Sequence, residues 1–195
     1  MKLLFKSACA AFVLTVIFSM LPFQAACADI PGEVFRLHIL ANSDSESDQA
    51  LKLKVRDRVL SFTEELYRGA ASKEEAEELT AAKLQAIADV AADEVQKNGC
   101  DYPVKAELTN MSFTTRHYGS FTLPAGSYDA LRLTIGEGEG HNWWCVMFPS
   151  LCVSGSPDVK AKEVFSDSEF DVVKNEKREY RFFVVELFEK ICSFF

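Results

Sequence analysis

The stretch from Glu33 to Leu40 alternates between apolar and polar residues, as a β-strand does. Its apolar positions are Phe35, Leu37 and Ile39, and its polar positions include Arg36 and His38. The polar run 41–48 that follows predicts a loop, in which Ser47 or Asp48 caps the next helix.

Two longer stretches then follow the period of an α-helix. In the first, apolar residues recur every three or four positions and form one stripe of Leu51, Val55, Val59, Phe62 and Leu66. Gly69 ends this helix, and Ser72 with Glu75 forms a capping box that begins the second. The second helix extends to Asn98-Gly99, with a core face of Leu84, Ile87, Ala91 and Val95.

From Pro103 onward the period changes to two. Further strands are predicted at residues 103–109, 112–118, 128–135 and 142–148. The glycine-rich segment 136–141 is predicted to be a tight turn that joins the last two, with glycines at positive φ. A final helix is predicted from Arg178. This order predicts an α+β fold in which an antiparallel or mixed sheet of about four to five strands packs against three helices.

The first 28 residues have the pattern of a signal peptide. Lys2 and Lys6 precede an uncharged apolar run, and Ala26-Cys27-Ala28 offers a cleavage site before Asp29. We therefore expect export. Two alternatives stay open: the run is retained as a membrane anchor, since about 20 apolar residues span a bilayer, or Cys27 carries a lipid.

Cleavage would leave residues 29–195, which we expect to form a single α+β domain. It removes two lysines and no acid, so the formal net charge changes from −8 to −10. A charge this negative disfavours binding to nucleic acid or to an anionic membrane surface. Contact with a membrane is therefore expected only through the N-terminal segment.

Four cysteines remain after cleavage, namely Cys100, Cys145, Cys152 and Cys192. An even number in an exported chain permits disulfides, and four cysteines allow three pairings. We favour Cys145–Cys152, because Pro149 between them can turn the chain back. For Cys192 a free buried thiol is the alternative.

The segment GEGEGHNWWCVMFPSLC, from Gly136 to Cys152, is unlike the rest of the chain. Its glycines do not follow G-x-G-x-x-G and no P-loop lysine follows them, so it does not match a phosphate-binding loop. A zinc ion would have only His141, Cys145 and Cys152 as ligands, without a C-x-x-C pair. We therefore predict neither a metal nor a cofactor.

The sequence disfavours two further chemistries, a calcium site and a cysteine nucleophile. Three acids alternate along the chain as in a calcium-binding loop, namely Asp44, Glu46 and Asp48. The segment lacks the glycine at the sixth position and the acid at the twelfth that such a loop requires. Cys145 with His117 or His141 could form the thiolate–imidazole pair of an exported cell-wall or thiol-dependent hydrolase. Cys145 falls in a predicted strand, however, and not at a helix N-terminus that would lower its pKa. We predict that the protein is not an enzyme, with this hydrolase as the alternative.

Recognition of a partner is the remaining class of function. Trp143 and Trp144 are consecutive in a predicted strand, so their side chains point to opposite faces. One can anchor the core while the other faces outward as a contact for a partner. The alternative is that the C-terminal helix buries both.

Two blocks of the chain carry a resemblance to a known family. FRLHILANSDSESDQALKLKVRDRVL (Phe35 to Leu60) and PAGSYDALRLTIGEGEGHNWWCVMFPSLC (Pro124 to Cys152) closely resemble the stage II sporulation protein R family of endospore-forming bacteria. Ser150 departs from the pattern, since members of the family carry a second proline there.

The resemblance implies a signalling protein that is made in the forespore and exported into the space between two membranes. There it would activate the membrane-embedded aspartic protease of the mother-cell side, which processes pro-sigma-E, and it would act by binding. The family brings no catalytic residues. Motif residues are candidates for fold integrity or receptor contact, and they are Arg36, His38, Asn42, Asp44, Arg56, Asn142, Trp143 and Trp144, with Cys145 and Cys152.

Overall fold

The computed structural model describes residues 6–7, 15, 18, 25–118, 121–150 and 164–174. The chain divides into two compact units. The larger unit consists of Pro31–Ser112 and Ser127–Val164, and the described part of the smaller unit comes from the remaining segments. The expectation that residues 29–195 form a single domain stays a prediction.

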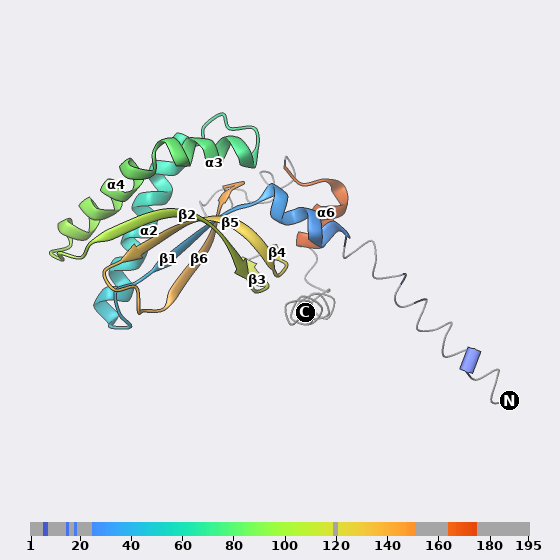
Figure 1. Ribbon diagram of the computed structural model, residues 1–195, viewed down its shortest axis with the longest axis horizontal. Helices are drawn as coiled ribbons and strands as arrows, with labels where there is room; N and C mark the ends of the chain where they lie inside the picture. The colour runs from blue at the N-terminus through green and yellow to red at the C-terminus, as the bar shows by residue number, and fades with distance from the viewer. Residues whose placement is uncertain are drawn as a thin grey trace. The chain divides into compact units, whose positions relative to one another are not determined.

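The larger unit is built around a four-stranded sheet with the strand order β2-β5-β1-β6 (Figure 1). The strands are β1 (Phe35–Leu40), β2 (Val104–Phe113), β5 (Gly126–Ile135) and β6 (Asn142–Phe148). Strand β1 pairs in parallel with β5 on one side and antiparallel with β6 on the other. The sheet is therefore mixed, which is one of the two arrangements predicted.

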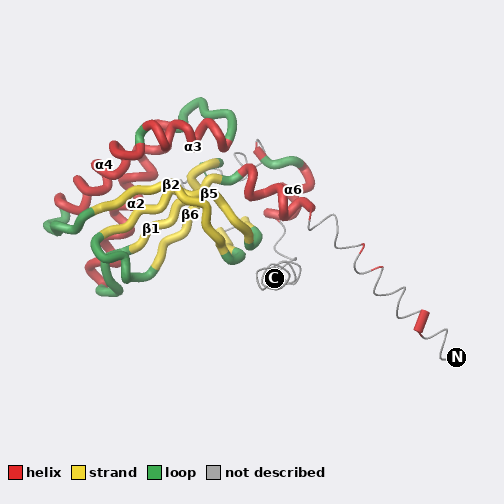
Figure 2. The backbone as a smooth tube through the Cα atoms, in the orientation of Figure 1, coloured by secondary structure: helices red, strands yellow, loops and turns green. Residues whose placement is uncertain are grey.

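Three helices cover one face of this sheet, as the tube in Figure 2 shows. They are α2 (Glu46–Leu66), α3 (Lys73–Ala82) and α4 (Leu84–Lys97). We call the face that they cover the inner face and the opposite one the outer face. The packing of helices on a mixed sheet confirms the predicted α+β class.

The hydrophobic core lies between the inner face and the helices. Phe35, Leu37 and Ile39 of β1 are buried in it, as the alternation predicts. The predicted stripe of α2 is confirmed, because Leu51, Val55 and Val59 are buried, while Phe62 and Leu66 pack at the margin. Burial of these side chains is the main term that stabilises the unit.

Helix α2 begins earlier than predicted. Its N-cap is Ser45, whose hydroxyl accepts a hydrogen bond from the Asp48 N–H at 3.2 Å. The prediction of Ser47 or Asp48 as the cap was therefore wrong. The Asp48 carboxylate is engaged with the loop before the helix, and the Ser45 hydroxyl takes the capping role.

The predicted second helix is divided into α3 and α4 at Lys83. Ser72 caps α3 through the Glu75 N–H, as predicted, and Gly99 after α4 has a φ of 76°. The Lys83 N–H donates to the carbonyls of both Leu79 and Thr80 at 3.1 Å, which tightens the last turn of α3. Nothing in the local sequence explains the break, because alanine, lysine and leucine all favour helix.

The described part of the smaller unit contains two short strands, helix α6 and the helical residues 25–30. Strands β3 (Arg116–Tyr118) and β4 (Phe121–Leu123) pair antiparallel, and α6 spans Asp167–Lys174. The Phe121 ring meets the Phe170 ring edge-on at 6.4 Å between centroids. Neither β4 nor α6 was predicted. The helix predicted from Arg178 lies outside the described residues.

Among the residues that the structure describes, every helix falls short of the length and apolarity that crossing a bilayer requires. Most of the predicted signal peptide lies outside these residues. Its cleavage, retention or lipidation stays a prediction.

Candidate functional site

The connection between β5 and β6 crosses the end of β1, because β1 lies between these two strands in the sheet. The glycine segment joins β5 to β6, as predicted, but these two strands are not neighbours in the sheet. The Gly140 N–H donates to the Ala41 carbonyl at 3.0 Å. Segments 41–48 and 136–141 thus lie against each other, and we call this pair of segments the loop junction.

Glycines make this close contact possible. Gly136 and Gly138 have φ angles of 59° and 68°, as predicted for glycines in a tight turn. A Cβ on Gly136 would lie 2.2 Å from Asn42 Oδ1, and one on Gly140 would lie 2.2 Å from the Ser43 carbonyl oxygen. The glycine spacing therefore serves the packing of two backbones.

Asp48 holds the first segment of the loop junction in shape. Its carboxylate accepts hydrogen bonds from Asn42 Nδ2 at 2.9 Å and from Ser43 Oγ at 2.6 Å. The residue is only 5% exposed. The hydrogen bonds from Ser43 and Asn42 lower the pKa of Asp48, against the opposing effect of burial. Its donors belong to the protein itself, which favours a structural role.

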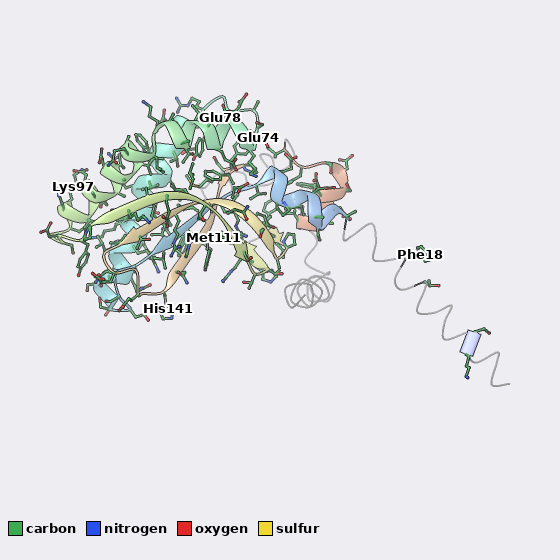
Figure 3. All side chains as sticks on the ribbon, viewed as in Figure 1. Phe18, Glu74, Glu78, Lys97, Met111 and His141 are labelled. Carbon is green, nitrogen blue, oxygen red and sulfur yellow. The ribbon has the colours of Figure 1, made fainter. Side chains whose placement is uncertain are left out.

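Asp44 connects the two segments. It accepts hydrogen bonds from the His141 backbone N–H at 2.6 Å and from the His141 ring Nδ1, and these bonds lower the pKa of Asp44. Both side chains are exposed, and Figure 3 shows His141 at the surface of the larger unit. Behind them, buried Lys52 donates to the His141 carbonyl at 2.7 Å and to Gln49 Oε1 at 2.5 Å. Side chains from both segments and from α2 therefore hold the loop junction together.

His38 and Trp144 form a stack on the outer face of the sheet. Their ring centroids lie 3.9 Å apart with an interplanar angle of 4°. His38 Nε2 lies 2.8 Å from Asn142 Oδ1, so Nε2 carries the proton and donates. Burial lowers the pKa of His38, and the bond to Asn142 opposes this while nearby Arg132 adds to it. The imidazole therefore stacks in its neutral form at neutral pH.

Trp143 points to the inner face, one residue earlier on the same strand. The guanidinium of Arg56 on α2 lies over its ring at 4.4 Å from the centroid, a cation–π contact. Arg56 also forms an ion pair with Asp57 at 2.6 Å. Trp143 is partly buried against the core. The two tryptophans thus point to opposite faces, as the strand period predicts, and each keeps part of its surface exposed.

Arg36 has a structural position. It is fully buried, and its guanidinium lies over the ring of Tyr128 at 4.8 Å from the centroid. An arginine with no exposed surface cannot present itself to a receptor without rearrangement. The position of Arg36 therefore favours a role in fold integrity over one in receptor contact.

Cys145 is buried in β6 and is disulfide-bonded. Cys152, which the sequence favours as its partner, lies outside the described residues, as does Cys192. Cys100 is a free thiol. The pairing Cys145–Cys152 therefore stays a prediction. Within residues 25–118, 121–150 and 164–174, no three histidine, cysteine or acidic side chains are placed to hold a metal ion.

The structure brings most of the motif residues to one end of the sheet. Asn42 and Asp44 lie in the loop junction, while His38, Asn142, Trp143 and Trp144 lie on the strands beside it. Sequence reasoning missed Lys52 and Arg132, because neither falls in an apolar stripe or an unusual motif. Arg132 could have been found only from its register opposite His38.

Comparison with protein families finds that residues 31–157 match the family described as Stage II sporulation protein R. Among curated proteins, Stage II sporulation protein R of Bacillus subtilis (strain 168) is 38% identical over 148 residues, which covers 76% of this chain and 66% of that relative. The match thus spans slightly less than two thirds of the relative's length. No solved structure matches the chain. The family match includes both sequence blocks from β1 onward and the whole loop junction, so this chain belongs to the stage II sporulation protein R family.

Proposed function

We propose that this chain is an exported signal of endospore formation that activates a membrane-embedded aspartic protease, which then processes pro-sigma-E. The chain would act by binding to the protease. The proposal rests on membership of the family together with one feature of the structure. The candidate side chains hold one another in a fixed arrangement, which suits the presentation of a surface.

That feature is clearest in the loop junction. Asp44 is engaged by His141, Asp48 by Asn42 and Ser43, and the charged end of Lys52 by backbone and side-chain oxygens. These interactions fix two loops that would otherwise lose conformational entropy on docking. A preorganised surface binds more tightly because this cost is met during folding.

The alternative thiol-dependent hydrolase is disfavoured by the state of its nucleophile. Cys145 is disulfide-bonded, whereas a cysteine nucleophile must be a free thiolate. The two candidate bases do not replace the missing thiolate: His141 is hydrogen-bonded to Asp44, and His117 Nδ1 lies 2.9 Å from Thr122 Oγ1 in β4. A disulfide also favours an oxidising compartment, which agrees with the proposed export.

Co-expression in a host that does not sporulate tests this function. The full chain, the protease and the pro-sigma-E precursor are produced together, and the precursor is followed by immunoblot. We expect the shortened product only when all three are present. A version without residues 1–28, which stays in the cytosol, is the control and should give no product. Processing in the absence of the chain, or with the cytosolic version, would contradict the proposal.

A further inference from the structure

Three planar side chains lie in one row across the outer face of the sheet. His38 of β1 is the register partner of Arg132 in β5 and of Trp144 in β6. Residues that are directly opposite on one face are close neighbours. A guanidinium, an imidazole and an indole therefore lie side by side, and we call Arg132, His38 and Trp144 the outer-face row.

Arg132 has binding capacity that the described structure does not use. Its side chain is 39% exposed, and its ion-pair partner is Glu107, at 3.7 Å from Nη1 to Oε1. That distance is too long for a hydrogen bond. Its Nε is buried and has no hydrogen-bond partner among the described residues, so a partner would meet the exposed end of the guanidinium. Lys105 already holds the same Glu107 at 2.5 Å. Two cations therefore share one carboxylate, which leaves local positive charge.

His38 and Trp144, the other two members of the row, form a rigid aromatic surface. His38 is 3% exposed and bonded to Asn142, so its ring is a fixed support. Trp144 lies flat against that support and keeps part of its surface exposed. A rigid aromatic beside a cation is typical of residues that contribute most to protein interfaces.

We propose that the outer-face row binds an acidic segment of the partner protease, with an aspartate or glutamate side chain on Arg132 and an adjacent apolar side chain on Trp144. This inference rests on the proposed function and names the chemistry of the contact. Arginine suits it because its planar guanidinium can donate two parallel hydrogen bonds to one carboxylate.

The charge of the chain favours a protein segment over other anionic partners. The formal net charge is −8, which would repel a nucleic acid or an anionic bilayer as a whole. A single acidic segment can still reach a local cationic position, because solvent and salt screen the more distant acids. The row also lies across three strands of a sheet, an arrangement that suits an extended contact.

Substitutions at Arg132 test the proposal in the co-expression assay. Arg132→Glu should lower precursor processing by at least about tenfold, and Arg132→Gln by several-fold, because the ionic hydrogen bonds are reversed or lost. Arg68→Gln is the matched control, since Arg68 is an exposed arginine of the larger unit, paired with Glu65 and outside the row. It should process the precursor as the wild type does. Secreted amounts and thermal midpoints are compared so that only folded variants are scored.

The outcomes separate the two proposals. If the wild-type chain does not drive processing, the proposed function fails. If the wild type does so and folded Arg132→Gln is equally active, the outer-face row is not the contact while the function stands.

A second measurement covers the case in which the variants do not fold. The purified wild-type chain is captured on the detergent-solubilised protease at increasing NaCl. Binding should weaken steadily as salt screens the Arg132 contact, and binding insensitive to salt would overturn the proposal. Size-exclusion chromatography tests whether a second copy of the chain binds the outer-face row instead of the protease. A wild-type dimer that Arg132→Glu converts to a monomer would show such an interface and would overturn the proposal.

Discussion

Two rows of side chains, one residue apart on the same three strands, have opposite character. On the inner face, Ile39 is the register partner of Leu133 and Trp143, and Ile39 and Leu133 are fully buried under the helices. On the outer face, the next row consists of Arg132, His38 and Trp144. Each row contains one tryptophan: Trp143 lies under Arg56 of α2, and Trp144 stacks on His38. The strand period therefore directs Trp143 to the core and Trp144 to the outer face, where part of its surface is exposed.

Different neighbours hold the two tryptophans. Trp143 is covered by Arg56 from α2, so its contact depends on the packing of a helix against the sheet. Trp144 stacks on His38 from the adjacent strand, so this contact lies within the sheet. The loop junction lies at the end of the strands that carry both rows. Its backbone hydrogen bonds join the segment after β1 to the segment before β6.

The largest effect is expected from Gly140→Ala, which should disturb both rows together. The added Cβ would lie 2.2 Å from the Ser43 carbonyl oxygen, and a backbone atom cannot move aside as a flexible side chain can. We expect a loss of about 3–5 kcal/mol in the free energy of unfolding. Urea denaturation followed by tryptophan fluorescence measures it.

Gly32→Ala is the control for that change. No atom lies within 4 Å of a Cβ at Gly32, and its φ is not positive. The free energy of unfolding should change by less than about 1 kcal/mol. Similar losses at Gly32 and Gly140 would contradict the role given to the loop junction.

The next effect separates the two tryptophans. Trp143→Ala should cost about 2–4 kcal/mol of stability, because it removes core packing and the contact with Arg56. Trp144→Ala should cost about 1–2 kcal/mol but should lower processing by at least about tenfold per folded molecule. The measurement pairs urea denaturation with the co-expression assay. Equal activity of both folded variants would place the receptor surface elsewhere.

The smallest effect concerns the protonation of His38. Its pKa is lowered below the ordinary value of 6.5, mainly by burial, so the unfolded chain takes up the proton first as the pH falls. The contribution of His38 to stability should be constant above about pH 6.5 and should fall as the pH decreases from there to the lower folded-state pKa.

Replacing His38 by glutamine should remove this part of the pH dependence. Urea denaturation of both proteins between about pH 7.5 and 5 measures the difference, and the other histidines cancel because both proteins contain them. Asp44 and Asp48 titrate below 3.8, outside this range, because their pKa values are lowered. Parallel curves for the two proteins would contradict the neutral, buried His38.

Local patterns in the sequence predicted the elements that a single period describes. The alternation of β1 and the stripe of α2 were both confirmed, because each depends on which residues share one face. The opposite directions of Trp143 and Trp144 follow from the same rule. The break at Lys83 could not be predicted, since the residues around it all favour helix.

The candidate site was only partly predictable because it depends on pairing between distant segments. The insertion of β1 between β5 and β6 places the loops around Asn42 and Gly140 together, although they are almost one hundred positions apart. A glycine-rich segment between two strands looks the same whether it forms a hairpin or crosses a third strand. The motif residues were identified from the family resemblance, whereas Lys52 and Arg132 emerged only from the register and packing.

A titration of the purified protease with the purified exported chain tests the central claim most directly, namely that the chain acts by binding alone. Processing of pro-sigma-E is measured at a fixed amount of protease while the amount of chain increases. Activation should rise until chain and protease are present in similar amounts and then remain constant, with the chain recovered unchanged. Full activation of all the protease by a small fraction of an equivalent of chain, growing with time, would show turnover and contradict the account.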